Sequence, residues 1–203
     1  MEQTSGFRTI GPTTYLCPIP AVMLGCAAPE GGDPNLITVA WTGIACSKPP
    51  MLSVSIRKER FSHDLITRSG EFTLNLIGRD LCRAMDYCGV KSAREVNKFA
   101  HLGLTAIPAP GLAHAPAVAQ APAFLSCKVH SVQELGSHDL FLANIVQVSV
   151  QERYFLPDGS IDESAMQLVG YVHGKYHALG DALGFFGYSV ASPEALERRM
   201  KKG

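Results

Sequence analysis

Three cations lie in four consecutive positions between an apolar run and a helical pattern: Arg57, Lys58 and Arg60. The stretch LSVSIRKERFSHDLITRSGEF (52–72) passes from a predicted strand into a predicted helix, and Ser62 is the predicted N-cap of that helix. A helix start carries unpaired backbone N–H groups and a dipole that favours negative charge. Because guanidinium groups bind oxyanions as bidentate forks, the stretch is typical of a phosphate site. The alternative is a solvated turn with an ordinary helix cap.

The strand that leads into this turn adds polar groups to the same place. In MLSVSIR (51–57), alternate side chains share one face, so Ser53, Ser55 and Arg57 point the same way. We expect two hydroxyls and a guanidinium to line the approach to the helix start.

A second candidate is NLITVAWTGIACSKPPM (35–51), which contains the only tryptophan, Trp41, followed by Thr42 and Gly43. A glycine beside a polar residue at a strand end lets a flat ligand approach the backbone. The amides there would hydrogen-bond the carbonyls and nitrogens of a ring. The alternative is a core tryptophan beside a turn.

Other chemistries have little support in the sequence. His173 and His177 are four positions apart, but Gly174 and the β-branched flank argue against a helix, and no third ligand is apparent. We therefore predict no metal site. No Ser-His-Asp or Cys-His arrangement follows from the spacing. The cysteines are scattered without a C-x-x-C pair and are interpreted as small buried apolar residues: Cys17, Cys26, Cys46, Cys82, Cys88 and Cys127.

Composition excludes several classes of partner. Lys plus Arg and Asp plus Glu each total 18, so we expect no nucleic-acid binding, and any phosphate site must be local. The apolar runs are shorter than the roughly 20 residues that span a bilayer. The N-terminus lacks the basic-then-apolar pattern of a signal peptide, so we expect a cytoplasmic protein with no membrane partner. With 203 residues, 46% of them apolar, the chain is predicted to form one domain over 1–203.

The elements that must position these residues are mostly strands. Apolar, β-branched runs over 21–27, 35–42 and 51–57 are separated by turn formers and predict three neighbouring antiparallel strands. The next elements are predicted as a helix over 62–70, a strand over 71–77, and helices over 79–89 and 92–103 that are closed by Gly89 and Gly103. A hairpin follows, formed by 124–135 and 138–155 around the turn GS. The pattern then predicts one or two strands within 166–180 and a helix over 192–202 that is capped by Ser192.

The segment 107–124 is rich in proline and alanine. It lacks the charge and polarity of a typical disordered segment, so we interpret it as an extended connection lying over the body rather than as a disordered linker. Seven or eight antiparallel strands with three or four short helices then predict a mostly β fold with short helices, an α+β barrel that is closed or nearly so. A βαβ nucleotide fold is disfavoured, because no helix separates the first strands and no G-x-G-x-x-G is present.

Four blocks in this order resemble the flavin reductase-like FMN-binding split-barrel family, and its flavoredoxin branch in particular. They are residues 35–76, CGVKSAREVNKFAHLGLT (88–105), LGSHDLFLANIV (135–146) and GKYHALGDALG (174–184). The resemblance covers about 15–185, and four motifs in order are more specific than any one of them.

The resemblance implies an antiparallel split barrel, usually a homodimer, that binds FMN non-covalently near the subunit interface. By position it implies that Trp41, Thr42 and Gly43 lie along the isoalloxazine ring, and that Ser55, Arg57, Arg60 and Ser62 take the phosphate and ribityl end. Lys98 matches a basic residue of the second block. His138 matches the histidine of the third block and would be the catalytic residue near the reactive edge of the ring. Ala93, Ala143 and Asn144 depart from the family, which often has glycine, glycine and an acid there.

Three functions follow as expectations. The first is an FMN-dependent oxidoreductase that passes electrons from NAD(P)H or a redox partner through the flavin to an acceptor. The second is a flavoredoxin-type electron-transfer protein with no NAD(P)H activity of its own. The third is a non-redox barrel that binds haem or another ligand. No nicotinamide fingerprint is present, so the donor rests on the resemblance alone.

Overall fold

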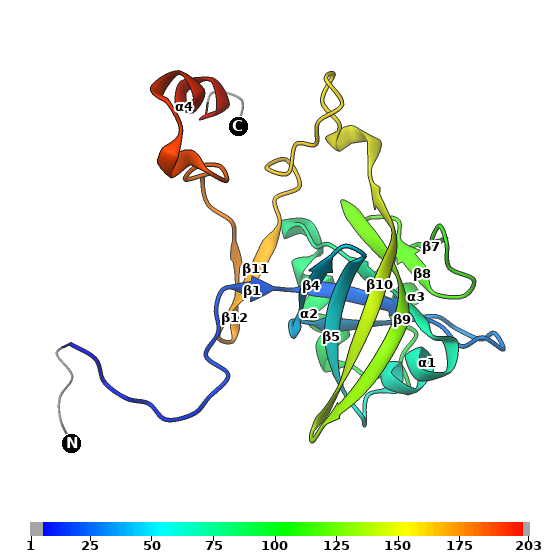
Figure 1. The fold of residues 1–203 in the computed structure, drawn as a ribbon. Helices are drawn as coiled ribbons and strands as arrows, with labels where there is room; N and C mark the ends of the chain where they lie inside the picture. The colour runs from blue at the N-terminus through cyan, green and yellow to red at the C-terminus, as the bar shows by residue number, and fades with distance from the viewer. Residues whose placement is uncertain (1–5, 201–203) are drawn as a thin grey trace.

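A seven-stranded antiparallel sheet forms the body of the computed structural model, which describes residues 6–200 (Figure 1). Its strands, in chain order, are β2 (Val22–Cys26), β3 (Asn35–Val39), β4 (Thr42–Ser47), β5 (Pro50–Arg57), β6 (Glu71–Asn75), β9 (Ala123–Leu135) and β10 (His138–Val150). In space they are ordered β3-β2-β6-β9-β10-β5-β4. The prediction of a mostly antiparallel β fold with short helices is therefore confirmed.

Two small sheets accompany the body. The first has the order β1-β11-β12 and joins β1 (Ile19–Pro20) near the start of the chain to the hairpin of β11 (Val169–Val172) and β12 (Lys175–Ala178). The second pairs β7 (Ala106–Pro108) with β8 (Pro116–Val118). Strand β8 lies inside the proline- and alanine-rich segment and β7 leads into it, so the segment is extended over the body as predicted.

The helices are short, and they are α1 (Phe61–Ser69), α2 (Cys82–Val90), α3 (Lys98–Leu102) and α4 (Pro193–Met200), with 3₁₀ turns η1 (Arg79–Leu81), η2 (Glu152–Tyr154) and η3 (Tyr188–Val190). Gly70 has φ 68° and ends α1 in the left-handed conformation, as the sequence predicted. At the other end of the chain Ser192 caps α4, because its Oγ accepts from the N–H of Ala195 at 3.3 Å. The predicted end of this last helix lies outside the described residues.

Several sequence expectations about elements are wrong. The first three predicted strands are not three neighbours: β5 pairs with β4 and β10 instead of β3. The sequence from Thr42 to Ser47 forms an additional strand, β4, that was not predicted. Gly89 lies within α2 rather than closing it, and only Lys98–Leu102 of the predicted second helix is helical. The strand predicted over 71–77 is β6, and all five of its residues are buried.

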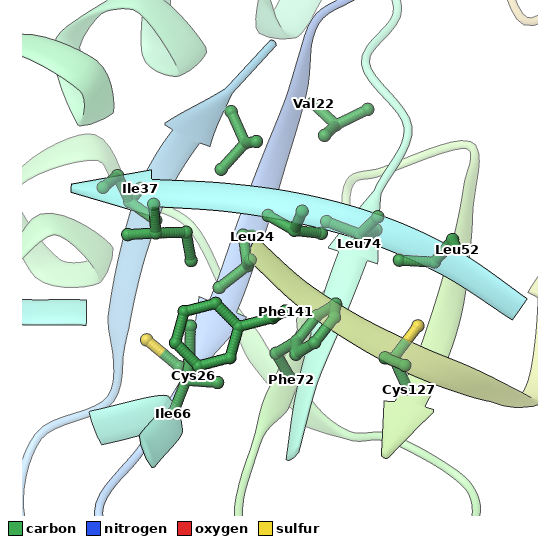
Figure 2. Packing of buried hydrophobic residues seen from close by; sticks show 14 of the residues in the cluster. Val22, Leu24, Cys26, Ile37, Leu52, Ile66, Phe72, Leu74, Cys127 and Phe141 are labelled. Carbon is green, nitrogen blue, oxygen red and sulfur yellow. The ribbon is translucent and has the colours of Figure 1, made fainter. Parts of the chain in front are cut away.

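The barrel core is packed with aliphatic and aromatic side chains from most strands of the sheet. Phe72 and Phe141, both 0% exposed, lie at its centre beside Leu24 and Ile66 (Figure 2). A second cluster fills the space between β2, β3 and the helices α2 and α3, and it includes Met85. These two packed layers fix β3, β5, α1 and α2 relative to one another, and these elements carry most of the candidate site residues.

Candidate functional site

Helix α1 begins at Phe61, one residue before the position predicted from the sequence. Arg60 occupies the N-cap position with an extended backbone, φ −72° and ψ 134°, and no side chain caps the helix. The prediction that Ser62 is the N-cap is wrong, since its side chain is 1% exposed and its Oγ accepts from Asn35 Nδ2 at 2.7 Å. The first N–H groups of α1 therefore have no side-chain acceptor from within the helix.

Next to this helix start lies a cavity of about 390 Å³, called the main cavity below. Its walls come from β3, β5, α2, the start of β10 and the β11–β12 hairpin. The structure brings five of the predicted site residues to it, namely Trp41, Ser55, Arg57, Arg60 and His138.

A smaller cavity of about 210 Å³ adjoins the main cavity and shares Ile37 and Arg60 with it. Four cationic side chains line this second space, called the cationic cavity below, against one carboxylate, that of Glu59. The cations are Arg60, Lys91, Arg94 and Lys98, and the predicted residue Ser62 lines the same space. The two cavities together form an elongated site with positive charge concentrated at one end.

Lys98 is 3% exposed and is held by two backbone carbonyls. Its Nζ donates to Leu36 O at 2.6 Å and to Cys88 O at 2.8 Å, which ties α3 to β3 and α2. Burial lowers the pKa of Lys98 below its usual value, because desolvation disfavours the ammonium form. An ammonium group has three donors, so one N–H remains for a ligand.

Asn35 belongs to this site but was missed in the sequence. It is 2% exposed, and its Oδ1 has no hydrogen-bond partner among the described residues. A buried acceptor without a donor costs roughly 1–3 kcal/mol, and such groups are rare in native proteins. The signal that could have found it is a polar residue at the head of an otherwise apolar strand, NLITV (35–39).

Of Trp41, Thr42 and Gly43, Trp41 alone lines the main cavity. Trp41 is 46% exposed and lines both the main cavity and an adjacent cavity, which also contains Thr42 and the N-terminal residues 13–16. Thr42 donates from Oγ1 to Ser53 O at 2.8 Å. Gly43 lies in β4, lines none of these cavities, and would meet nothing within 4 Å if it carried a Cβ.

The side chains of β5 alternate between its two faces as predicted. Leu52, Val54 and Ile56 are buried, whereas Ser53 and Ser55 are half-buried and Arg57 is exposed. Ser55 and Arg57 line the main cavity, but Ser53 does not. Arg57 also forms an exposed ion pair with Glu59 at 3.5 Å.

His138 begins β10 and lies opposite Arg57 in the strand register. Its Nδ1 is 2.8 Å from Ser137 Oγ, which leaves Nε2 for a ligand in the main cavity. The next residue, Asp139, points to the other face of the strand and contacts His63 Nε2 at 2.8 Å and Lys58 Nζ at 3.4 Å. This cluster fixes the turn after β5 to the start of β10.

Burial alone would raise the pKa of Asp139, but the hydrogen bond from His63 and the ion pair with Lys58 outweigh it, so the pKa is lowered. The carboxylate is therefore stabilised in its ionised form beside the turn that carries Arg57 and Arg60.

The wall of the main cavity opposite β5 was not predicted. Tyr176 OH donates to Asp86 Oδ1 at 2.9 Å and joins the β11–β12 hairpin to α2. Burial raises the pKa of Tyr176, and the bond to Asp86 raises it further. Tyr171 packs beside Tyr176, with ring centroids 5.7 Å apart. No local pattern reveals this wall, because Asp86 and Tyr176 are 90 residues apart in the chain.

The described part of the chain shows neither a cluster of metal-binding side chains nor a membrane-spanning helix. Residues 6–200 hold no group of three or more His, Cys, Asp or Glu side chains placed to bind a metal ion. Within the same residues, no helix has the length and apolar character needed to cross a membrane.

A family model, the flavin reductase like domain, matches residues 15–180. The chain belongs to the flavin reductase-like family. The structure of the flavoredoxin of Desulfovibrio vulgaris (Miyazaki F) is similar with a TM-score of 0.84 and 31% identity, over 91% of this chain and 100% of that one. This likeness confirms the split-barrel fold and the flavoredoxin branch of the family, as the four sequence blocks indicated.

Two further relatives extend the comparison. The FMN-binding protein of Thermus thermophilus, with bound 1-cyclohex-2-enone, has a TM-score of 0.70 and 24% identity over 85% of this chain and 94% of that one, which shows the shared fold. The reductase component of a 4-nitrophenol monooxygenase from Rhodococcus opacus is 28% identical over 120 residues, or 59% of this chain and 60% of that protein.

Proposed function

We propose that this chain binds FMN non-covalently across the main and cationic cavities and uses it to pass electrons from a reduced donor to an acceptor. The observation that carries the proposal is the asymmetry of the site. A cavity with Trp41 and two tyrosines on its walls adjoins, through Arg60, a cavity lined by four cations. A planar ring system with a phosphate at one end has the complementary shape and charge.

The residues present fit this cofactor. The main cavity, at about 390 Å³, lies within the roughly 300–1,000 Å³ that is usual for small-molecule sites. The cationic cavity offers the charge that a phosphate dianion needs, and the start of α1 offers N–H groups. The unpaired Oδ1 of Asn35 offers an acceptor for a hydroxyl of the ligand.

Each predicted residue receives a role in this proposal. Arg60, Ser62 and Lys98 hold the phosphate in the cationic cavity. Ser55 and Arg57 contact the ribityl end, and Trp41 lies along the ring. Thr42 and Gly43 stand beside Trp41 on β4 and contribute to the ring end, although Gly43 does not reach the main cavity in the single chain.

FMN, when bound, supplies the redox chemistry, and the protein supplies binding, orientation and electrostatics. His138 presents Nε2 to the main cavity, where we propose that it donates or accepts a hydrogen bond at the edge of the ring. Asp86 is the one carboxylate among the residues that line this cavity, and it lies on the wall that the phosphate does not occupy. Like-charge repulsion at Asp86 and attraction at Arg60 therefore favour a single orientation of an anionic ligand.

Two donors fit the site. The Rhodococcus opacus relative is a reductase component, which favours a reduced nicotinamide, NADH or NADPH. The flavoredoxin likeness favours an electron carrier that is reduced by a partner protein. In either case the acceptor receives electrons at the open side of the main cavity beside Trp41, which is 46% exposed.

Anaerobic mixing of the FMN-loaded protein with NADH or NADPH decides between these donors. Loss of the visible flavin absorption with either nicotinamide, at a rate that saturates with its concentration, supports the reductase. If neither nicotinamide bleaches the flavin while a chemical reductant does, the chain is an electron carrier. A protein that takes up no FMN, or that shows a haem Soret band instead, contradicts the proposal.

A further inference from the structure

A second large cavity, of about 380 Å³, lies between the 3₁₀ turns η1 and η2 and shares no lining residue with the main or cationic cavity. Its walls are η1, the turn around residues 120–122, η2 and the segment 165–167. It is called the η1–η2 cavity below. The proposed flavin site gives this space no role.

The walls of this cavity are held by specific contacts. Arg79 N donates to Gln167 O at 3.1 Å, and a Cβ on Gly78 would lie 2.7 Å from Met166 O, so only glycine permits this approach. Gln167 has φ 47°, a left-handed conformation that is uncommon outside glycine. Gln120 is fixed at both ends of its amide by residues 103 and 105. The space is therefore built into the fold rather than left between mobile loops.

Two arginines line the cavity without a carboxylate partner. Arg153 Nη2 donates to Tyr154 OH at 2.9 Å, and its guanidinium lies 4.8 Å from the centre of the Tyr154 ring. Arg79 has no side-chain hydrogen bond or ion pair among residues 6–200. Asp80 is the one carboxylate in the lining, and no described ion pair joins it to either arginine.

Tyr154 is 9% exposed, so it holds the Arg153 guanidinium over a buried platform. A guanidinium that is fixed in this way loses little conformational entropy when it binds a ligand, because its position is already set. Arg153, held in this way, and Arg79, whose side chain makes no described polar contact, line one cavity and match the oxygens of a carboxylate or a phosphate.

We propose that the η1–η2 cavity binds a compact oxyanion, a small carboxylate or a phosphate-bearing molecule, between Arg79 and Arg153. The ligand completes the hydrogen bonds of the two guanidinium groups, and the apolar part of the lining, Leu81, Pro122 and Met166, accommodates its carbon skeleton. This site is independent of the proposed flavin site and does not rest on it.

Arginine-specific modification with phenylglyoxal, followed by peptide mass spectrometry, tests the proposal residue by residue. Inorganic phosphate and succinate are the two probes, used separately on the flavin-free protein. Each probe that binds should slow modification of Arg79 and Arg153 together, while Arg83, an exposed arginine four positions further on, reacts at an unchanged rate. Protection by one probe alone identifies the oxyanion. Protection by neither, or equal protection at Arg83, overturns the proposal.

Residue-resolved protection also separates this site from the flavin site, where phosphate in the cationic cavity would protect Arg60 and Arg94 instead. In Arg153→Gln, loss of one charge-assisted fork should weaken the protection of Arg79 by about tenfold, whereas Arg83→Gln should leave it unchanged. If Arg153→Gln does not fold, Arg79→Gln serves as the second variant, read out at Arg153. The proposal is overturned if the probe slows modification of the remaining arginine as strongly in a folded variant as in the wild-type protein.

Discussion

At the scale of single residues, the site combines exposed cations such as Arg60 with polar side chains that are buried. Lys98 and Ser62 are 3% and 1% exposed, and Asn35 is 2% exposed. Such groups are costly unless they are hydrogen-bonded, so each has a structural role as well as the proposed role in binding. The two roles can be separated by measuring stability without the ligand.

Replacing Lys98 by methionine should destabilise the flavin-free protein. The change leaves the carbonyls of Leu36 and Cys88 without donors, and each buried unsatisfied group costs roughly 1–3 kcal/mol. We expect the free energy of unfolding, measured with urea, to fall by about 2 kcal/mol or more. Lys91→Met, at an exposed position of the same cavity, should change it by less than about 0.5 kcal/mol. Equal effects would contradict the structural role of Lys98.

The lowered pKa of Asp139 predicts that the stability of the protein depends on pH. Its pKa is lower in the folded chain than the usual 3.8, so its stabilising contribution is complete above that value and is lost as the pH falls through the folded pKa. In acid titrations of stability, the wild-type protein should therefore lose stability below about pH 4 more steeply than Asp139→Asn. Asp64→Asn, at an exposed position of α1, is the control. If the wild-type protein and Asp139→Asn lose stability equally steeply at acid pH, Asp139 does not have the lowered pKa described here.

Three of the predicted residues that the structure brings to one cavity had a local signal in the sequence. The cation cluster and the alternation of β5 placed Ser55, Arg57 and Arg60 beside one cavity. The cap assignment of Ser62 failed because a buried hydrogen bond to Asn35, 27 residues earlier, takes its hydroxyl. Asp86 and Tyr176 lacked any local signal, since their contact depends on how the β11–β12 hairpin packs against α2.

At the scale of elements, polar side chains of β6 hold the proline-rich segment: Thr73 and Asn75 bond residues 116 and 118, and Glu71 bonds residues 113–115. Glu71 in β6 is 5% exposed and accepts hydrogen bonds from the backbone N–H groups of Ala113, His114 and Ala115. An apolar segment with few side-chain donors is thus fixed through its backbone. Composition suggested an extended connection, but the partner that holds it could not be read from the sequence.

Glu71→Gln should loosen this segment. A neutral amide accepts more weakly, and its NH₂ group would face backbone donors, so we expect a loss of about 2 kcal/mol in the free energy of unfolding. Hydrogen exchange at residues 113–115 should become faster, while exchange in β10 should change only by the global loss of stability. Glu95→Gln, at an exposed position, should have no such effect. Unchanged exchange at 113–115 would rule out this anchoring role.

Strand pairing shows where element prediction reaches its limit. The hairpin of β9 and β10 was predicted with its turn at Gly136 and Ser137, because a short turn lies between two long β-branched runs. The pairing of β5 with β10, 81 positions apart at Arg57 and His138, was not predicted, and it is this pairing that brings His138 to the site. Local patterns give strands, whereas non-local packing decides their neighbours.

At the scale of the whole molecule, the chain exposes more surface than its mass requires. Its accessible area is 12752 Å², whereas a compact monomer of 21.8 kDa exposes about 9,300 Å². The two ends account for much of this excess, because the N-terminal segment and the segment with α4 extend away from the barrel (Figure 1). Leu183, Phe186 and Val190 in the latter are at least 88% exposed. The family resemblance implied a homodimer, and we propose that the second copy of the chain covers these ends.

Light scattering on the flavin-free protein should then give twice the chain mass. Phe186→Asp should lower the measured mass to that of one chain. The thermal stability of the monomer should not fall, because a 102% exposed side chain has no contacts to lose within one chain. Phe186→Leu retains an apolar side chain and should remain dimeric. A wild-type protein that is monomeric, or a Phe186→Asp variant that stays dimeric, would contradict this role of the C-terminal segment.

The most direct test of the central claim compares the dissociation constants of FMN and riboflavin, which share a ring and differ by the phosphate. Quenching of flavin fluorescence measures both for the wild-type protein, for Arg60→Gln, and for Arg68→Gln at the far end of the same helix. If the phosphate lies in the cationic cavity, FMN binds at least about tenfold more tightly than riboflavin in the wild type and in Arg68→Gln. Arg60→Gln should reduce that ratio while it leaves riboflavin affinity nearly unchanged. Equal affinity of the wild-type protein for FMN and riboflavin would contradict the account.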